Sequence, residues 1–202
     1  AIASYDKTLA IKPDYHDAWL NRGVAVGKAV SYNPIAAEIL QGRFPNSPPV
    51  MPNPQLTRCG YEGQLLCYEE GLKHCPADTH PEGFGELHQW IGAAHYFRGK
   101  YDYRQRQSLY WQAVSSYNRA LSTLTEKAYP QLHLETLRDL IKALLGLGQV
   151  AEAQQLGRDG TDLLRRLVAD EKRSQREKQQ LALKFADFQQ LTVDILVQSG
   201  QW

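Results

Sequence analysis

Apolar side chains recur along this chain at intervals of three and four residues, which is the spacing of one face of an α-helix. The pattern is clearest in two stretches: Leu137, Leu140, Ile141, Leu144 and Leu145, and then Leu181, Phe185, Phe188, Leu191, Thr192 and Ile195. No segment shows the strict apolar-polar alternation typical of a strand. The sequence therefore predicts an all-α protein.

Capping residues and prolines mark where the predicted helices begin and end. Ser174 and Glu177 form the S-x-x-E pattern of a capping box, which predicts one long helix that runs to about Ser199 and ends at Gly200. Residues 42–54 hold five of the chain's ten prolines and cannot continue a helix. This stretch is expected to belong to an inserted loop.

A more specific pattern lies at the start of the chain. Ala1 and Tyr5 fit A-x3-F with Tyr in place of Phe, and Pro13 follows where a helix-ending proline is expected. Trp19 and Gly23 then stand at the W and G positions of W-x2-L-G-x2-Y. This stretch resembles a tetratricopeptide repeat.

The resemblance implies stacked helix pairs that form a right-handed solenoid with a concave groove. Arg22 and Val26 depart from the family pattern, because they replace its Leu and its Tyr. In such a repeat the glycine lets two helices approach closely, and an aromatic side chain fills the space opposite.

Weaker copies of the repeat follow. Tyr68 and Pro76 keep the interval of Tyr5 and Pro13, so a helix over 61–75 is expected to pair with the helix around Trp19. Pro13 and Pro76 are 63 residues apart, against roughly 34 in the family, which predicts an insertion of about 29 residues.

The resulting plan is a single solenoid over 1–202. Its parts are a closing half repeat (1–13), a repeat with an inserted loop at about 31–60 (16–75), a stretched repeat (86–126), a degenerate repeat (131–169) and an opening half repeat (174–202).

The expected function is protein binding, with a peptide or helix held in the concave groove. By alignment with the family, the groove is lined by Leu20, Val24, Lys28, Glu86, Gln89, Ala93, Tyr96, Glu135, Arg138, Lys142, Asp187, Gln190 and Asp194. Families that clamp a C-terminal carboxylate have Lys and Asn at the places of Leu20 and Val24, which argues against that kind of partner. Arg138 and Lys142, one turn apart, are the best candidates for contact with an anion.

A second resemblance covers residues 86–202. The segments 99–107 and 181–194 are similar in sequence to repeat regions that precede CHAT domains in bacterial multidomain proteins. CHAT domains are a caspase-like peptidase family. This resemblance implies an alternative role as the substrate-recognition or regulatory segment of a fused protease. It carries no catalytic residue over to this chain.

Composition narrows the function classes. The net charge of +1 gives no general attraction for nucleic acid or an acidic membrane, and no apolar stretch approaches the roughly 20 residues of a membrane span. Three cysteines without a CxxC pair fit a reducing cytoplasm. The beginning and end of the sequence suggest a piece of a longer protein.

The candidate chemistry is sparse, and we expect no enzyme activity, no cofactor and no metal. Cys59, Cys67 and Cys75 are eight residues apart, with three histidines nearby, but Cys67 and Cys75 on one helix would be about 12 Å apart, too far to share a zinc ion. No GxSxG, HExxH, P-loop or GxGxxG motif is present.

An RNA-contacting role is a weaker alternative. Cations and aromatic residues alternate between Arg98 and Trp111, the mixture that phosphate contact and base stacking need. Repeat helices also use aromatic residues to fill their core, and the balanced charge favours packing as the explanation.

The two ends are expected to expose apolar stripes because each would lack its partner helix. These stripes are Ile2, Tyr5 and Leu9 at the start, and Leu191, Ile195 and Leu196 at the end. They predict self-association through the terminal helices at high concentration.

Overall fold

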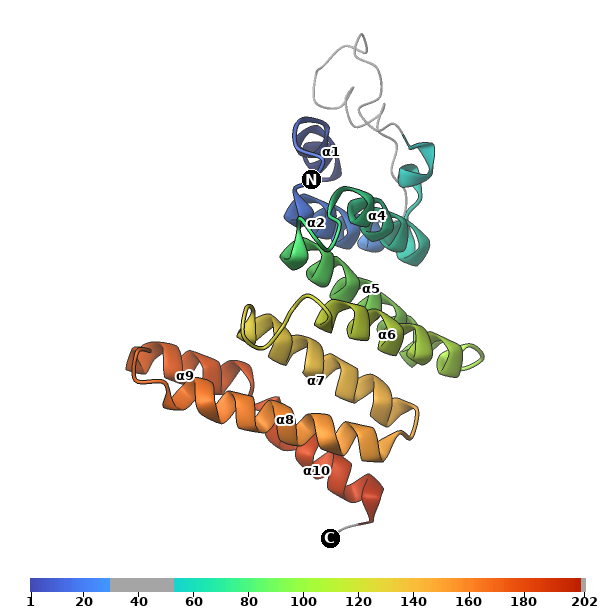
Figure 1. Ribbon diagram of the computed structural model, residues 1–202. Coiled ribbons are helices and arrows are strands. Elements are labelled where there is room, and N and C mark those ends of the chain that lie inside the picture. Colours follow the sequence, from blue (N-terminus) through green and yellow to red (C-terminus); the bar gives the residue numbers. More distant parts are fainter. Residues whose placement is uncertain (30–52, 201–202) are drawn as a thin grey trace. The chain divides into compact units, whose positions relative to one another are not determined.

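The computed structural model describes residues 1–29 and 53–200, and the regular structure in those ranges is entirely helical (Figure 1). The chain divides into two compact units, Ala1–Ala94 and His95–Trp202, with the division inside the helix α5 (Pro81–Tyr101). The prediction of an all-α protein is confirmed for the described residues. The single solenoid over 1–202 stays a prediction.

The described part of the first unit begins and ends with helices. Its elements are α1 (Ile2–Ile11), α2 (His16–Lys28), the 3-10 turn η1 (Pro54–Thr57), α4 (Gly60–His74) and the first part of α5. Most of the predicted inserted loop lies outside the described residues. Its last part contains η1, where the side chain of Asn53 accepts a hydrogen bond from the backbone N–H of Gln55 (3.0 Å).

α2 and α4 form an antiparallel pair built on two reciprocal glycine-aromatic contacts. A Cβ on Gly23 would overlap the ring of Tyr68, and a Cβ on Gly71 would lie 2.9 Å from Cγ of Trp19. Each glycine therefore makes room for the aromatic ring of the opposite helix. The predicted pairing of the helix around Trp19 with the helix around Tyr68 is confirmed.

Arg22 connects the elements of this unit from the inside. Its side chain is fully buried, and Nε donates to Asp6 Oδ1 (2.7 Å) on α1. One terminal nitrogen donates to Cys67 Sγ (2.8 Å) on α4, and the other to the carbonyl oxygen of Leu56 (3.0 Å) in η1. A buried guanidinium needs such partners because an unpaired charge is costly in the protein interior.

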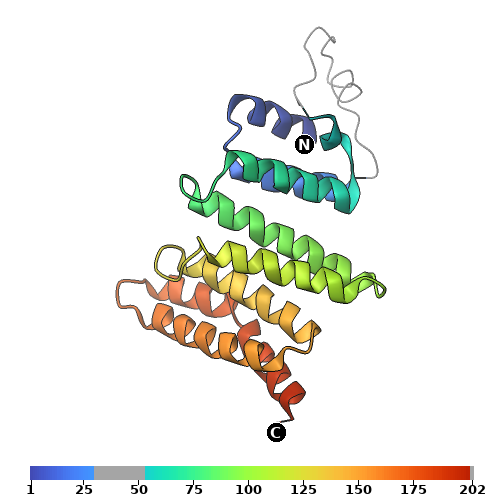
Figure 2. The same cartoon turned by 45° about the vertical axis from the view of Figure 1, so that its right-hand side comes forward.

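The second unit continues from the end of α5. It contains α6 (Arg106–Leu121), α7 (Pro130–Gly146), α8 (Val150–Ala169), α9 (Gln175–Lys184) and α10 (Asp187–Ser199). α7 packs on α6 and α8, and Figures 1 and 2 show α7 and α8 as neighbouring helices. The turn between them places Gly148 at φ +74°, a conformation that favours glycine. The leucine stripe of α7 forms the centre of the core, as its spacing predicted.

Tyr110 fills the space that two glycines leave in this core. A Cβ on Gly99 would lie 2.7 Å from Tyr110 Cε1, and a Cβ on Gly146 would overlap the other edge of the same ring. Tyr96 stacks on Tyr110 with ring centroids 5.2 Å apart. One aromatic side chain therefore packs against both α5 and α7.

The predicted long C-terminal helix is wrong, because the chain breaks at Phe185 and Ala186 into α9 and α10. The capping box at Ser174 is confirmed, with the Ser174 N–H donating to Glu177 Oε2 (2.7 Å), and so is the end at Gly200 (φ +70°). The break lets α9 pack on α8 while α10 packs on both α8 and α7. Phe185 on one side of the break and Phe188 on the other are both buried, with ring centroids 6.1 Å apart.

The predicted exposed stripes at the two ends are also largely wrong. Leu9, Leu191 and Ile195 are 3–5% exposed, because α1 folds onto α2 and α10 folds onto α8. Ile2 and Tyr5 are half-buried against the core of the first unit. At the C-terminal end the exposed apolar residues are Val193, Leu196 and Val197.

No helix in the described ranges combines the length and the apolar character needed to cross a membrane.

Candidate functional site

The residues predicted to line a groove fall in both units. In the first unit they lie on α2 and α5: Leu20 and Gln89 are buried, Lys28 is exposed, and Val24, Glu86 and Ala93 are half-buried. Leu20 contributes to the core, so neither it nor Gln89 has much surface for a partner.

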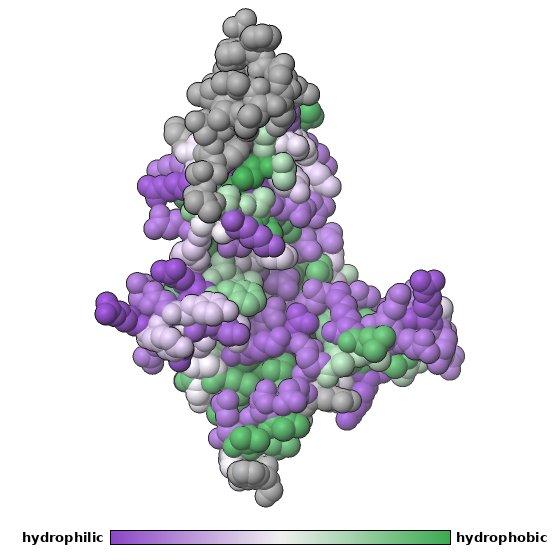
Figure 3. Space-filling view, turned by 180° about the vertical axis from the view of Figure 1, so that it is seen from behind, coloured by the Kyte–Doolittle hydropathy of each residue, from purple (hydrophilic) through white to green (hydrophobic). Residues whose placement is uncertain are grey.

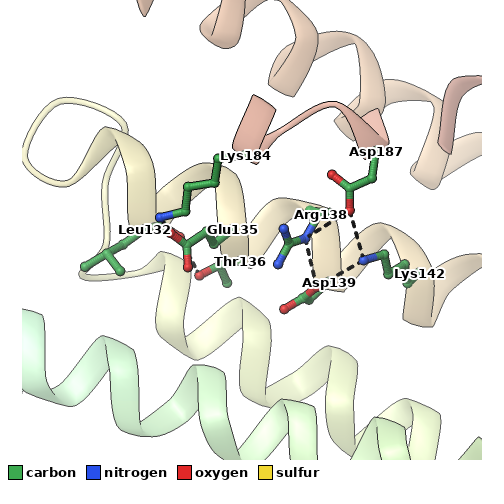
Figure 4. Close-up of polar contacts among 8 residues, drawn as sticks. All are labelled: Leu132, Glu135, Thr136, Arg138, Asp139, Lys142, Lys184 and Asp187. Carbon is green, nitrogen blue, oxygen red and sulfur yellow. Dashed lines mark hydrogen bonds and ion pairs between the residues drawn. The ribbon is translucent and has the colours of Figure 1, made fainter. Parts of the chain in front are cut away.

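In the second unit the structure brings several of the predicted residues into direct contact. Arg138 and Lys142 on α7 both approach Asp187 Oδ2 at the start of α10, at 3.6 and 3.4 Å, and both also approach Asp139 Oδ1, at 3.2 and 3.6 Å (Figure 4). One turn earlier on α7, Glu135 pairs with Lys184 at the end of α9. We call these six residues the charged seam.

The charged seam changes the interpretation of Arg138 and Lys142. They were predicted to contact an anion on a partner, but the carboxylates beside them belong to Asp139 and Asp187 of this chain. The charges of the seam cancel, and they hold α9 and α10 against α7. The seam is therefore a joint within the unit.

The other residues of this unit that were predicted to line the groove, Tyr96, Gln190 and Asp194, contact side chains close to them in the structure. Tyr96 is stacked on Tyr110, and the exposed Gln190 donates to Asp194 one turn further along α10 (3.0 Å). Their role in binding a partner stays a prediction.

A groove that the sequence did not predict lies between α8 and the pair α9–α10. α10 approaches α8 closely where α8 has glycines: a Cβ on Gly160 would lie 2.6 Å from Phe188 Cε1, and one on Gly157 would lie 3.1 Å from Ile195 Cδ1. Beside this contact the helices leave cavities of about 420 and 580 Å³. Both cavities include Thr161, Arg165 and Thr192 in their lining, so they form one continuous feature, the α8 groove.

The walls of the α8 groove are mainly apolar. Leu164, Val168 and Ala182 line one cavity, and Ile195 and Leu196 line the other. Figure 3, seen from behind, shows hydrophobic surface at the C-terminal end of the chain.

The hydroxyl groups in this groove are already satisfied. Thr161 donates to the Gly157 carbonyl (2.7 Å) and Thr192 to the Phe188 carbonyl (2.9 Å), both within their own helices. A ligand therefore meets methyl groups and aliphatic carbon here, with little demand for new hydrogen bonds.

Arginines supply the charge at the rim. Arg165 Nη1 forms an ion pair with Asp162 Oδ1 at 3.1 Å. Arg158 instead donates a hydrogen bond from Nη2 to the neutral Gln155 Oε1 (2.9 Å). The rim of the groove therefore carries one net positive charge from these side chains.

The cysteines are engaged in the core of the first unit. Cys67 accepts from Arg22, and burial raises the pKa of its thiol. Cys75 lies 3.4 Å from the Asp14 carbonyl, and burial raises its pKa to about 11. Both are protonated thiols at neutral pH, and a thiolate is the form that attacks or binds metal.

Two of the histidines near the cysteines, His74 and His88, pack against aromatic rings. His74 stacks on Trp19 with ring centroids 5.9 Å apart, and His88 meets the ring of Phe84 edge-on at 4.5 Å. Burial lowers the pKa of His95.

The run of cations and aromatics covers the end of α5, the turn at 102–105 and the start of α6. Arg106 donates to the Gly99 and Lys100 carbonyls (3.3 and 3.4 Å) and lies over the ring of Tyr103. Tyr101 and Tyr103 are more than three-quarters exposed.

Comparison with known proteins gives no relative from which a function could be transferred: no protein-family model, no curated protein and no solved structure matches the chain.

Proposed function

We propose that this protein is a non-enzymatic binding scaffold of tetratricopeptide type, and that the α8 groove holds an amphipathic peptide segment of a partner protein. The observation that carries the proposal is the continuous apolar groove between α8 and α9–α10, with arginines at its rim. Grooves of this kind suit a helix that buries one apolar face.

The tetratricopeptide interpretation is supported by the reciprocal contacts of Gly23 with Tyr68 and of Gly71 with Trp19. They do what the repeat pattern requires, because a residue without a side chain lets each helix accept the ring of the other. Gly99 and Gly146 around Tyr110 follow the same principle in the second unit.

The charges at the rim indicate which peptides bind best. Arg158 has no acidic neighbour to neutralise it among its contacts in the described chain, so a carboxylate on the ligand gains a new ion pair there. The preferred ligand is a segment with leucine-like side chains on one face and Glu or Asp beside them.

A designed peptide tests this directly. The probe is a fluorescent amphipathic peptide of about 16 residues, long enough for about 24 Å of helix, with a leucine face flanked by glutamates. We expect saturable binding by fluorescence anisotropy, and weaker binding of a peptide that has lysines in place of the glutamates.

Two variants with matched controls locate the site. Ala182→Trp fills the groove and is expected to weaken binding more than tenfold, whereas Leu183→Trp, at the neighbouring position of α9 that is exposed and does not line the groove, is expected to leave it unchanged. Arg158→Glu is expected to cost about fivefold to tenfold, since an exposed ion pair contributes up to about 1 kcal/mol and its reversal adds repulsion. Arg176→Glu on the exposed face of α9 is its control. Equal loss in a variant and its control would refute the assignment of the groove.

RNA contact is a second candidate, favoured by the exposure of Tyr101 and Tyr103 beside Arg104. Anisotropy with labelled oligouridine measures it, and Tyr101→Ala together with Tyr103→Ala removes the proposed stacking surface. Binding that survives this double substitution would exclude the surface.

A further inference from the structure

Three potential metal ligands from two helices meet in the first unit. His16 and Asp17 begin α2, and Glu86 lies on the second turn of α5. His16 Nε2 lies 3.1 Å from Glu86 Oε2 and 3.7 Å from Asp17 Oδ1, and the three ligand atoms are all within 4.8 Å of one another. This cluster is separate from the α8 groove and has no part in the proposed peptide binding.

The packing of α5 holds the imidazole in place. Gly83 allows the close approach, because a Cβ there would lie 2.9 Å from both Cβ and Cγ of His16. Glu86 follows three residues later, which puts it on the same face of α5 as Gly83. The side chains of His16 and Glu86 are 23% and 19% exposed and that of Asp17 is 52% exposed, so the cluster is held on one side and open to solvent on the other.

The spacing of the ligand atoms suits a transition metal. In a tetrahedral site with bonds of about 2.0–2.2 Å, neighbouring ligand atoms are about 3.3–3.6 Å apart. The distances of 3.1 and 3.7 Å bracket that range, and a small rotation of the exposed Asp17 side chain brings the third ligand closer.

The electrostatic environment favours a cation at the same place. The carboxylates of Glu86, Asp17 and Glu82 all interact electrostatically with the imidazole of His16, and Glu86 also forms a hydrogen bond with it. These carboxylates produce a negative potential at Nε2, which stabilises a proton or a metal ion there. The donor set includes an imidazole nitrogen, which favours zinc-like ions over magnesium or calcium.

We propose that His16, Asp17 and Glu86 form a binding site for a divalent transition-metal ion of the zinc class, which links the start of α2 to α5. A water molecule or Glu82, one turn before Glu86, completes the coordination. The site differs from the cysteine-based zinc site rejected in the sequence analysis, and it departs from the expectation that the chain binds no metal. Its consequence is a first unit that Zn²⁺ stabilises, because an ion that binds only the folded form shifts the equilibrium toward it.

Isothermal titration of the metal-free protein with Zn²⁺ at about pH 8, where the metal competes little with protons, tests the proposal. We expect one ion per chain and a rise in the unfolding temperature. His16→Gln and Glu86→Gln should each weaken binding at least tenfold, and Asp17→Asn should weaken it less because its side chain is the most exposed.

His80 and Asp14 provide the matched control. Their side chains form a His-carboxylate pair in the same unit, with Nε2 and Oδ2 3.3 Å apart, and they are not part of the cluster of three potential ligands. Asp14→Asn should therefore leave Zn²⁺ binding unchanged, and so should Cys59→Ser at the half-buried thiol.

Circular dichroism of each metal-free variant separates loss of the site from loss of the fold. The absence of saturable Zn²⁺ binding by the wild type would overturn the proposal. Equal affinities of Glu86→Gln and the wild type, or equal losses in Glu86→Gln and Asp14→Asn, would overturn it as well.

Discussion

Gly23→Ala tests the packing on which the first unit depends. The added Cβ would lie 2.7 Å from Cζ and 2.9 Å from Cδ1 of Tyr68, and closer still to Cε1, whereas carbon atoms in contact need about 3.5 Å. The Tyr68 ring is fully buried and cannot move aside, so α2 and α4 must separate by about 1 Å.

The magnitude follows from two opposing effects. Overpacking a core costs about 1–3 kcal/mol, while replacing glycine by alanine inside a helix gains about 0.8–1 kcal/mol. Because neither the backbone of α2 nor the Tyr68 ring can yield cheaply, we expect a net loss of about 2 kcal/mol in the free energy of unfolding.

Two further variants make the test specific. For Gly27→Ala the three atoms nearest to the new Cβ all belong to the flexible side chain of Gln64, the closest at 3.0 Å, so we expect between no change and about 1 kcal/mol of stabilisation. Tyr68→Ala alone should cost about 3–5 kcal/mol. In the Tyr68→Ala background the alanine at position 23 no longer meets a ring. The free energy of unfolding of the double variant should therefore be about 3 kcal/mol higher than the sum of the two single effects predicts.

Urea unfolding followed by circular dichroism measures these free energies, and amide exchange in α2 and α4 assigns the transition to the first unit. Additive effects of Gly23→Ala and Tyr68→Ala would refute the argument, as would a Gly23→Ala protein that is more stable than the wild type.

The other predictions concern single features. Arg22→Met removes the ion pair that Arg22 forms with the buried Asp6 carboxylate and should cost about 3–5 kcal/mol in urea unfolding. Adding Asp6→Leu should recover part of that loss, and a double variant no more stable than the single one would contradict this. Cys67 and Cys75 should resist alkylation by iodoacetamide at neutral pH in the folded protein and react after unfolding, because their thiols are buried and protonated. Mass spectrometry of the native protein measures this, and alkylation of either cysteine would contradict the prediction. Ser174→Ala should cost about 1 kcal/mol and speed amide exchange in the first turn of α9, with no change in α7.

The parts of this fold that the sequence predicted depend on short-range patterns. The spacing of Leu137, Leu140, Ile141 and Leu144 fixes which face of α7 is buried, and the capping box at Ser174 fixes where α9 begins. The pairing of α2 with α4 was predictable because Trp19 and Gly23 match positions of a repeat pattern, and Tyr68 and Pro76 keep the interval of Tyr5 and Pro13.

The features that the sequence did not predict depend on contacts between distant residues or on a break without a marker. Phe185 and Ala186 interrupt a continuous apolar stripe with no proline or glycine, so nothing local shows that α9 ends there. Asp187 pairs with Arg138 and Lys142 only because the break places the start of α10 beside α7. The cluster of His16, Asp17 and Glu86 was missed for a similar reason, since the helices that carry these residues are far apart in the sequence.

Arg22 fixes the end of the long connection between α2 and α4 to the helices of the first unit. The guanidinium holds the Leu56 carbonyl in η1, where the chain returns to the helices before α4. The same group binds Asp6 on α1 and Cys67 on α4, so the return point is fixed to the helices on both sides of it. Closing a longer connection costs chain entropy that grows only as the logarithm of its length, so a buried anchor of this strength can offset it. Arg22 is therefore a structural anchor, because its partners include a residue near the end of the connection as well as residues of α1 and α4.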